Sequence, residues 1–158
     1  MNSHLLSCEK LDIPDALALD HEQLRTELVK AASRPGRIGL AARKVAHLYL
    51  PHFAKEEQMI SSAFGLLKDL AARRLLPDAL QIEPMIGLFS ARHHAALNDH
   101  KAINAAVEQL LLEASQEQDA DIVDLVCKLS DHERIEDQVM YPTALFFARS
   151  VRDALAVH

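Results

Sequence analysis

The chain has 158 residues, of which 49% are hydrophobic and 25% charged, and these proportions are ordinary for one soluble globular domain. It contains only 4 glycines and 6 prolines, which disfavours an all-β fold rich in turns and favours helices. The net charge of −6, the lack of a basic stripe with interleaved aromatic residues and the lack of a long apolar run argue against nucleic acid and membrane as partners.

The first predicted helix follows a short N-terminal arm at residues 1–11. Asp12 is a suitable N-cap, because its side chain can accept a hydrogen bond from the first turn of a helix. An apolar stripe at helical spacing then includes His21, and the Ser-Arg-Pro-Gly stretch at residues 33–36 ends the helix. We assign residues 12–158 to a single helical domain.

The second predicted helix has a proline in its interior. Apolar residues at helical spacing over residues 40–60 predict the helix, and Pro51 removes one of its backbone hydrogen bonds. We expect a kink immediately before His52, where it could aim the imidazole ring. Residues 65–74 are expected either to continue this helix or to form a small helix of their own.

The second half of the chain predicts two more long helices. A long crossover is expected at residues 77–84, followed by a helix over residues 85–114. The polar stretch at residues 115–119 predicts a turn, after which the fourth helix runs to the Tyr-Pro pair at residues 141–142. A terminal helical segment is expected at residues 144–156, so that four main helices are each long enough to cross a bundle.

One pattern of histidines and acidic residues occurs twice in the chain, with nearly equal intervals. In the first copy an Asp-His pair is followed by a His-x-x-x-Glu, and the second copy repeats this order. The first copy consists of Asp20, His21, His52 and Glu56. The second copy consists of Asp99, His100, His132 and Glu136.

The spacing within each copy suits metal binding. Residues four apart on a helix project from the same face, so His52 and Glu56 can hold one ion, or Glu56 can bridge two. The fourth helix repeats this arrangement, and the single histidines of the first and third helices each supply one nitrogen, as in metal sites inside helix bundles. The donors are nitrogen and oxygen without thiolate, which favours Fe or Mn over Zn and disfavours an iron-sulfur cluster.

These motifs resemble those of the hemerythrin-like proteins, a family with a His-His-Glu cation-binding domain. The likeness covers residues 12–150 and is greatest at residues 19–24, 52–57, 99–103 and 132–136. It implies an all-α fold, an antiparallel up-down four-helix bundle, here with a short extra C-terminal helical segment. It also implies two Fe ions bridged by carboxylates and an oxo or hydroxo group, with Mn or Zn less favoured. The implied metal ligands are His21, His52, Glu56, His100, His132 and Glu136.

The chain departs from the oxygen-carrying hemerythrins on its third and fourth helices. Those proteins have a His-x-x-x-His pair on the third helix, but the positions four away from His100 are Ala96 and Asn104. On the fourth helix both Glu136 and Asp137 are candidates for the bridging carboxylate, and we favour Glu136 because the first copy has the same spacing. With one imidazole fewer, more coordination positions stay open, so reactive chemistry, sensing or iron handling is favoured over oxygen carriage.

Other polar residues near these motifs are predicted to have structural roles and not to bind metal. His93 is two turns from His100 on the same face and is expected to be capped or to face solvent. Tyr49 and Tyr141 are close enough in sequence to hydrogen-bond an iron-bound oxygen, but packing at a helix end is the favoured interpretation. Glu57 is expected to be an ordinary charged residue at the shoulder of its helix.

The two aspartates of the Asp-His pairs are candidates for holding a ligand in place. Adjacent residues on a helix point about 100° apart, so neither Asp20 nor Asp99 can easily hydrogen-bond its own neighbour. Each can instead orient a histidine of another helix. The two cysteines, Cys8 and Cys127, form no Cys-x-x-Cys pair and are expected to be free thiols in a reducing compartment, the cytoplasm.

The sequence therefore predicts a non-haem di-iron protein that binds O₂, peroxide or NO, with a role in oxidative or nitrosative stress. The alternative is an iron sensor or iron buffer that acts through a partner protein. No separate nucleophile or general base is visible, so chemistry at the metal is favoured over hydrolysis, and whether the protein is an enzyme stays open. A metal-free interaction bundle leaves the repeated pattern unexplained.

Overall fold

The computed structural model describes residues 15–71 and 79–155, and it is all-helical, without strands among these residues. The helices are α1 (Asp15–Ala32), α2 (Gly36–Ala71), α3 (Ala79–Glu117), α4 (Ala120–Ile135) and α5 (Tyr141–Leu155), with a π-helical segment, η1 (Glu136–Met140), between the last two. The predicted all-α class is confirmed. The predicted arm at residues 1–11, the N-cap Asp12 and Cys8 lie outside the described residues, while Cys127 is a free, exposed thiol.

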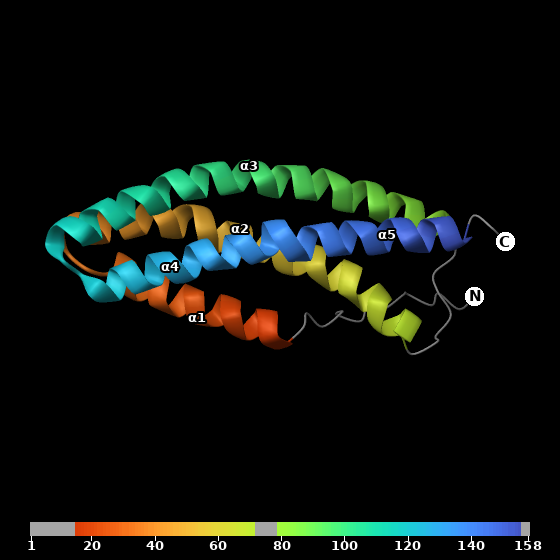
Figure 1. The fold of residues 1–158 in the computed structure, drawn as a ribbon, viewed down its shortest axis with the longest axis horizontal. Helices are drawn as coiled ribbons and strands as arrows, with labels where there is room; N and C mark the ends of the chain where they lie inside the picture. Colours follow the sequence, from red (N-terminus) through yellow and green to blue (C-terminus); the bar gives the residue numbers. More distant parts are fainter. Residues whose placement is uncertain (1–14, 72–78, 156–158) are drawn as a thin grey trace, which may run out of the picture.

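The helices pack lengthwise beside one another, with α4, η1 and α5 forming one continuous rod (Figure 1). Helix α2 packs against α1 and α3, and α3 also packs against α4 and α5. The core between them is apolar, and its largest fully buried members are Tyr49, Phe53, Leu24, Leu28, Ile38, Ile103, Leu110 and Leu129. Within the parts of the chain that the structure describes, none of the helices has the length and apolarity that a membrane crossing requires.

Two tight turns lie at the same end of the molecule. Helix α1 ends at Ala32, as predicted, and Gly36 opens α2 with φ of 79°, a conformation that favours glycine. Asp119 caps α4 by accepting a hydrogen bond from the backbone N–H of Ile122 at 3.2 Å. The guanidinium of Arg34 in the first turn pairs with the Asp119 carboxylate, so the two turns are tied together.

Of two predictions for the middle of the chain, the structure decides one between its alternatives and corrects the other. Helix α2 continues through Pro51 as far as Ala71, so residues 65–71 extend it and form no separate helix. The crossover predicted at residues 77–84 is wrong from residue 79 onward, because α3 begins at Ala79. Pro51 costs α2 one backbone hydrogen bond, which a helix of 36 residues tolerates because it has many others.

The predicted interruption of the fourth helix is earlier and milder than expected. The backbone changes to π-helix at Glu136, where the N–H of Tyr141 bonds to the carbonyl of Glu136, and then returns to α-helix. The terminal segment therefore begins at Tyr141 and not at residue 144. Five residues separate Glu136 from Tyr141, and the wider π turn brings positions of this spacing onto one face of the helix.

Candidate metal centre

The candidate ligands from both copies of the sequence pattern meet in the interior of the protein. None of these side chains is more than 5% exposed, although all are ionisable. They come from α1, α2, α3, α4 and η1, so the site exists only when these elements are packed together. The residues are His21, His52, Glu56, His100, His132 and Glu136.

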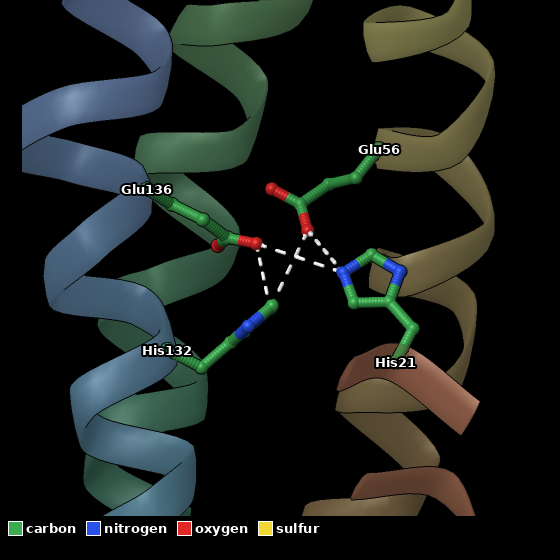
Figure 2. Close-up of side chains that lie close together, drawn as sticks. All are labelled: His21, Glu56, His132 and Glu136. Carbon is green, nitrogen blue, oxygen red and sulfur yellow. Dashed lines mark ion pairs between the residues drawn. The ribbon is translucent and has the colours of Figure 1, made fainter. Parts of the chain in front are cut away.

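They form two groups, each of which could hold a metal ion. In each group every residue offers one ligand atom, and these atoms lie within 4.8 Å of one another. Position A consists of His21, His132, Glu56 and Glu136 (Figure 2). Position B consists of His52, His100, Glu56 and Glu136. The two positions share both carboxylates, which is the arrangement expected of a bridged metal pair.

Glu136 presents one carboxylate oxygen to each position. Its Oε1 lies 2.6 Å from Nε2 of His132, on the side of position A. Its Oε2 lies 3.4 Å from Nε2 of His100, on the side of position B. A carboxylate oriented in this way can bind two cations at once, so Glu136 has the geometry of a bridge.

Glu56 divides its oxygens in the same manner. Its Oε1 is 3.4 Å from Nε2 of His52 at position B, and its Oε2 is 3.8 Å from Nε2 of His21 at position A. The hydroxyl of Tyr141 donates a hydrogen bond to Oε1, the oxygen that faces position B. Tyr141 thus reaches the site, whereas the sequence alone favours packing at a helix end.

The side chains present fit a pair of cations. Several of their buried atoms have no hydrogen-bond partner within the described part of the chain, namely Nε2 of His21 and His132, Oε2 of Glu56, and both carboxylate oxygens of Glu136. At position B the Nε2 atoms of His52 and His100 face each other at 2.9 Å. Imidazole lone pairs and carboxylates gathered without counter-charges are unfavourable in a protein interior, and cations at positions A and B would satisfy them.

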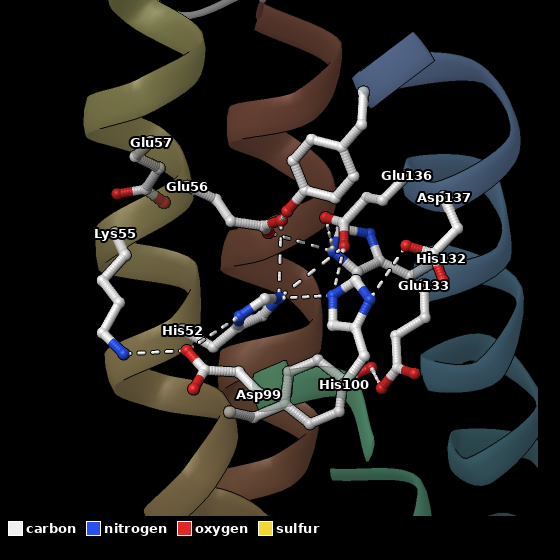
Figure 3. Close-up of polar contacts among 12 residues, drawn as sticks. His52, Lys55, Glu56, Glu57, Asp99, His100, His132, Glu133, Glu136 and Asp137 are labelled. Atoms are coloured by element: carbon white, nitrogen blue, oxygen red, sulfur yellow. Dashed lines mark hydrogen bonds and ion pairs between the residues drawn. The ribbon is translucent and has the colours of Figure 1, made fainter. Parts of the chain in front are cut away.

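Each histidine of the site turns its other ring nitrogen, Nδ1, toward an acidic residue of another element, and Figure 3 shows this for His52 with Asp99 and for His100 with Asp137. A carboxylate that accepts from Nδ1–H fixes the tautomer in which Nε2 carries the free lone pair. The pairs, with their N···O distances, are His132–Asp20 at 2.6 Å, His21–Glu57 at 3.0 Å, His100–Asp137 at 3.0 Å and His52–Asp99 at 3.9 Å.

These pairs decide three expectations from the sequence. Asp20 hydrogen-bonds a histidine of another helix, as predicted, whereas Asp99 is too far from His52 for a hydrogen bond and pairs instead with Lys55 at 2.8 Å. The expectation for Glu57 is wrong, because this carboxylate accepts hydrogen bonds from the ring of His21 and from Arg25. Asp137, the alternative bridge, faces the outer nitrogen of its histidine and belongs to neither group of candidate ligands.

Glu133 is a buried acid that the sequence interpretation missed. It is 4% exposed, and the hydroxyl of Tyr49 lies 2.8 Å from its Oε1 and 2.9 Å from the carbonyl of Leu129. Burial raises the pKa of Glu133. The sequence could have indicated its burial, because Glu133 lies at helical spacing from Val126 and Leu129, both of which are buried. Tyr49 therefore packs beside this acid and not at a helix end.

His93 and its neighbour His94 stay outside the two groups, but His93 does not face solvent as expected. The ring of His93 is half-buried against that of Tyr141, with centroids 5.0 Å apart, and burial lowers the pKa of His93. His94 is exposed and its Nδ1 donates to the carbonyl of Ser90 at 2.8 Å. Neither imidazole competes for a place at the centre.

The two shared carboxylates cannot both ionise easily without a cation beside them. Burial and the neighbouring Glu136 raise the pKa of Glu56 to about 12. Burial also opposes ionisation of Glu136, yet its close contacts with the imidazole rings of His100 and His132 outweigh burial and hold the pKa of Glu136 below its usual range. The same contacts with Glu136 overcome desolvation at both histidines and raise the pKa of each above 6.5.

Metal binding should weaken as the pH falls, beginning above the range in which free histidine titrates. In the metal-free protein His100 and His132 have raised pKa values, so protons compete with the metal before the pH reaches 6.5. A raised pKa stabilises the metal-free fold below 6.5, and this stabilisation is lost as the pH rises through the raised value. The difference in stability between the metal-loaded and the metal-free protein therefore becomes smaller at low pH.

Metal retention against a chelator, measured between about pH 5 and 8, tests this expectation. Asp20→Asn is an informative comparison, because it removes the charge beside His132 while leaving every candidate ligand in place. This variant should hold the metal more weakly at about pH 8, because an outer carboxylate is lost. Its retention should fall less steeply toward low pH than that of the native chain, since its His132 loses an anion that favours the protonated ring. Retention that does not change across the whole range would contradict the expectation.

Comparison of the chain with protein-family models, with curated proteins and with solved structures finds no match. What can be concluded about the centre therefore follows from its own geometry. That geometry is two buried groups of nitrogen and oxygen donors that share two carboxylates.

Proposed function

We propose that this chain is a hemerythrin-like protein, an antiparallel four-helix bundle with a di-iron centre that binds O₂, peroxide or NO. The observation that carries the proposal is the division of oxygens at Glu56 and Glu136, each of which offers one oxygen to each histidine pair. A single ion does not require two carboxylates that each face both histidine pairs. Two carboxylate bridges offset the mutual repulsion of two cations held close together.

The donor set supports iron as the resident metal. Imidazole and carboxylate without thiolate suit Fe, with Mn and Zn less favoured. When bound, an iron pair supplies Lewis-acid and redox chemistry toward small oxygen and nitrogen species. The protein holds His21, His100 and His132 through hydrogen bonds to outer carboxylates and places the site beside the apolar core.

Metal analysis of the purified chain tests the proposal. We expect about two iron atoms per chain after expression with iron, because six donor residues exceed what one ion with an open position uses. An oxo-bridged ferric pair should add strong near-ultraviolet absorption. One metal per chain in a well-loaded preparation, or zinc alone, would overturn the proposal.

Reaction assays then separate the proposed function from iron storage or sensing. The iron-loaded chain is mixed with peroxide or with NO, and consumption is followed together with iron release. A protein that handles these ligands should bind or consume them with the iron retained. An iron buffer should release iron without consuming either.

A further inference from the structure

The two metal positions differ in what covers them. At position A the ring of Phe53 stacks on His21, with centroids 4.4 Å apart, and meets the edge of His132 at 5.4 Å. Phe53 is fully buried and apolar, and it belongs to the hydrophobic core. Position A is therefore bordered by an aromatic ring that offers no hydrogen bond to a ligand.

Position B borders a pocket that opens between α2 and α3. The pocket has a volume of about 170 Å³ and reaches His52 and Glu56 at its inner end. Ala96 is buried on α3, one turn before His100, and its methyl group leaves space where a longer side chain would fill the pocket. Ala95 is exposed at the rim. A water molecule occupies about 30 Å³ in the liquid, so a ligand of two or three heavy atoms fits this space.

Polar groups gather on the same side of the centre. The Lys55 ammonium lies at the pocket, paired with Asp99 at 2.8 Å (Figure 3). Because Asp99 is engaged in this ion pair, Nδ1 of His52 has no hydrogen-bond partner, and this ring is held less firmly than the other three. The hydroxyl of Tyr141 lies against Oε1 of Glu56, the oxygen that faces position B.

We propose that small ligands reach the centre through the pocket between α2 and α3 and bind at position B, the position held by His52 and His100. The ligand class is a diatomic molecule or a small anion of two or three heavy atoms. The volume of the pocket sets this size, and the charge of Lys55 is balanced by Asp99 within the pocket. Position A serves to anchor the pair. This inference rests on the proposed di-iron centre.

Azide binding to the iron-loaded full-length chain tests the route, because azide is a small linear anion whose binding to ferric iron changes the visible absorption. Ala96→Leu fills the pocket, and Ala95→Leu covers its rim from an exposed position where folding is not at risk. Ala105→Leu, the same change at an exposed position elsewhere on α3, is the matched control. We expect Ala96→Leu to slow azide association about tenfold or more in stopped-flow measurements, and Ala95→Leu to slow it less.

The iron content of each variant is measured on the same samples. The inference holds if both pocket variants keep two irons and bind azide slowly while the control behaves as the native chain. The inference is overturned if iron-loaded Ala95→Leu and Ala96→Leu both bind azide at the native rate. It is also overturned if Phe53→Leu, at position A, speeds azide association while the two pocket variants do not change it. If the Ala96 variant does not fold, the rim variant decides. A native chain that holds no iron pair contradicts the proposed function and not the route.

Discussion

Replacing Glu136 with alanine should abolish binding of both metal ions, whereas replacing its neighbour Asp137 should leave them bound more weakly. Glu136 offers one oxygen to each position and is fully buried, so its loss removes a ligand from both ions and a bridge between them. Asp137 accepts a hydrogen bond from the outer nitrogen of His100 and belongs to neither group of candidate ligands. Loss of such an outer partner commonly costs about 10–100-fold in metal affinity, and loss of the bridge should cost more.

The two variants form a matched pair because they remove adjacent carboxylates from the same π-helical segment. Iron content after purification, followed by competition with a chelator, gives the affinities, and circular dichroism checks that both variants stay helical. Glu56→Ala should behave like Glu136→Ala, since Glu56 divides its oxygens in the same way. An iron-free Asp137→Ala together with an iron-loaded Glu136→Ala would show that the bridge is assigned to the wrong residue.

Removing the metal should lower the thermal midpoint of the protein by about 10 °C or more. The metal-free interior contains imidazole nitrogens and carboxylate oxygens without hydrogen-bond partners, and each such group costs about 1–3 kcal/mol. For a chain of this length each kcal/mol lowers the midpoint by about 2–4 °C. The candidate ligands come from α1, α2, α3, α4 and η1, so loss of the metal weakens the packing of these elements against one another.

Calorimetry of the loaded and the metal-free protein at one neutral pH measures the difference. A Glu56→Ala, Glu136→Ala double variant is the control, because chelator treatment should not change a protein that has no bridged site to empty. Equal midpoints for the loaded and metal-free native chain would mean that metal at this site does not stabilise the fold.

Local sequence determined the helices and most of their ends. The apolar stripes predict four long helices, and the Ser-Arg-Pro-Gly stretch at residues 33–36 correctly ends the first one, because proline and glycine act within a single turn of backbone. The start of α3 at Ala79 and the change to π-helix at Glu136 were not predicted. Each includes a lost or displaced backbone hydrogen bond within a long helical stretch, which local sequence rules do not anticipate.

The candidate ligands were identifiable from the sequence because helix geometry places residues four apart on one face, and the pattern occurs twice. Which histidines share a position was not identifiable. Only the packing of the helices joins His21 to His132 and His52 to His100, residues that are far apart in the chain. The roles of Glu57 and Tyr141 were decided in the same way, because their partners lie on other elements. Spacing along one helix fixes which side chains share a face, whereas contacts between helices depend on how the whole core packs.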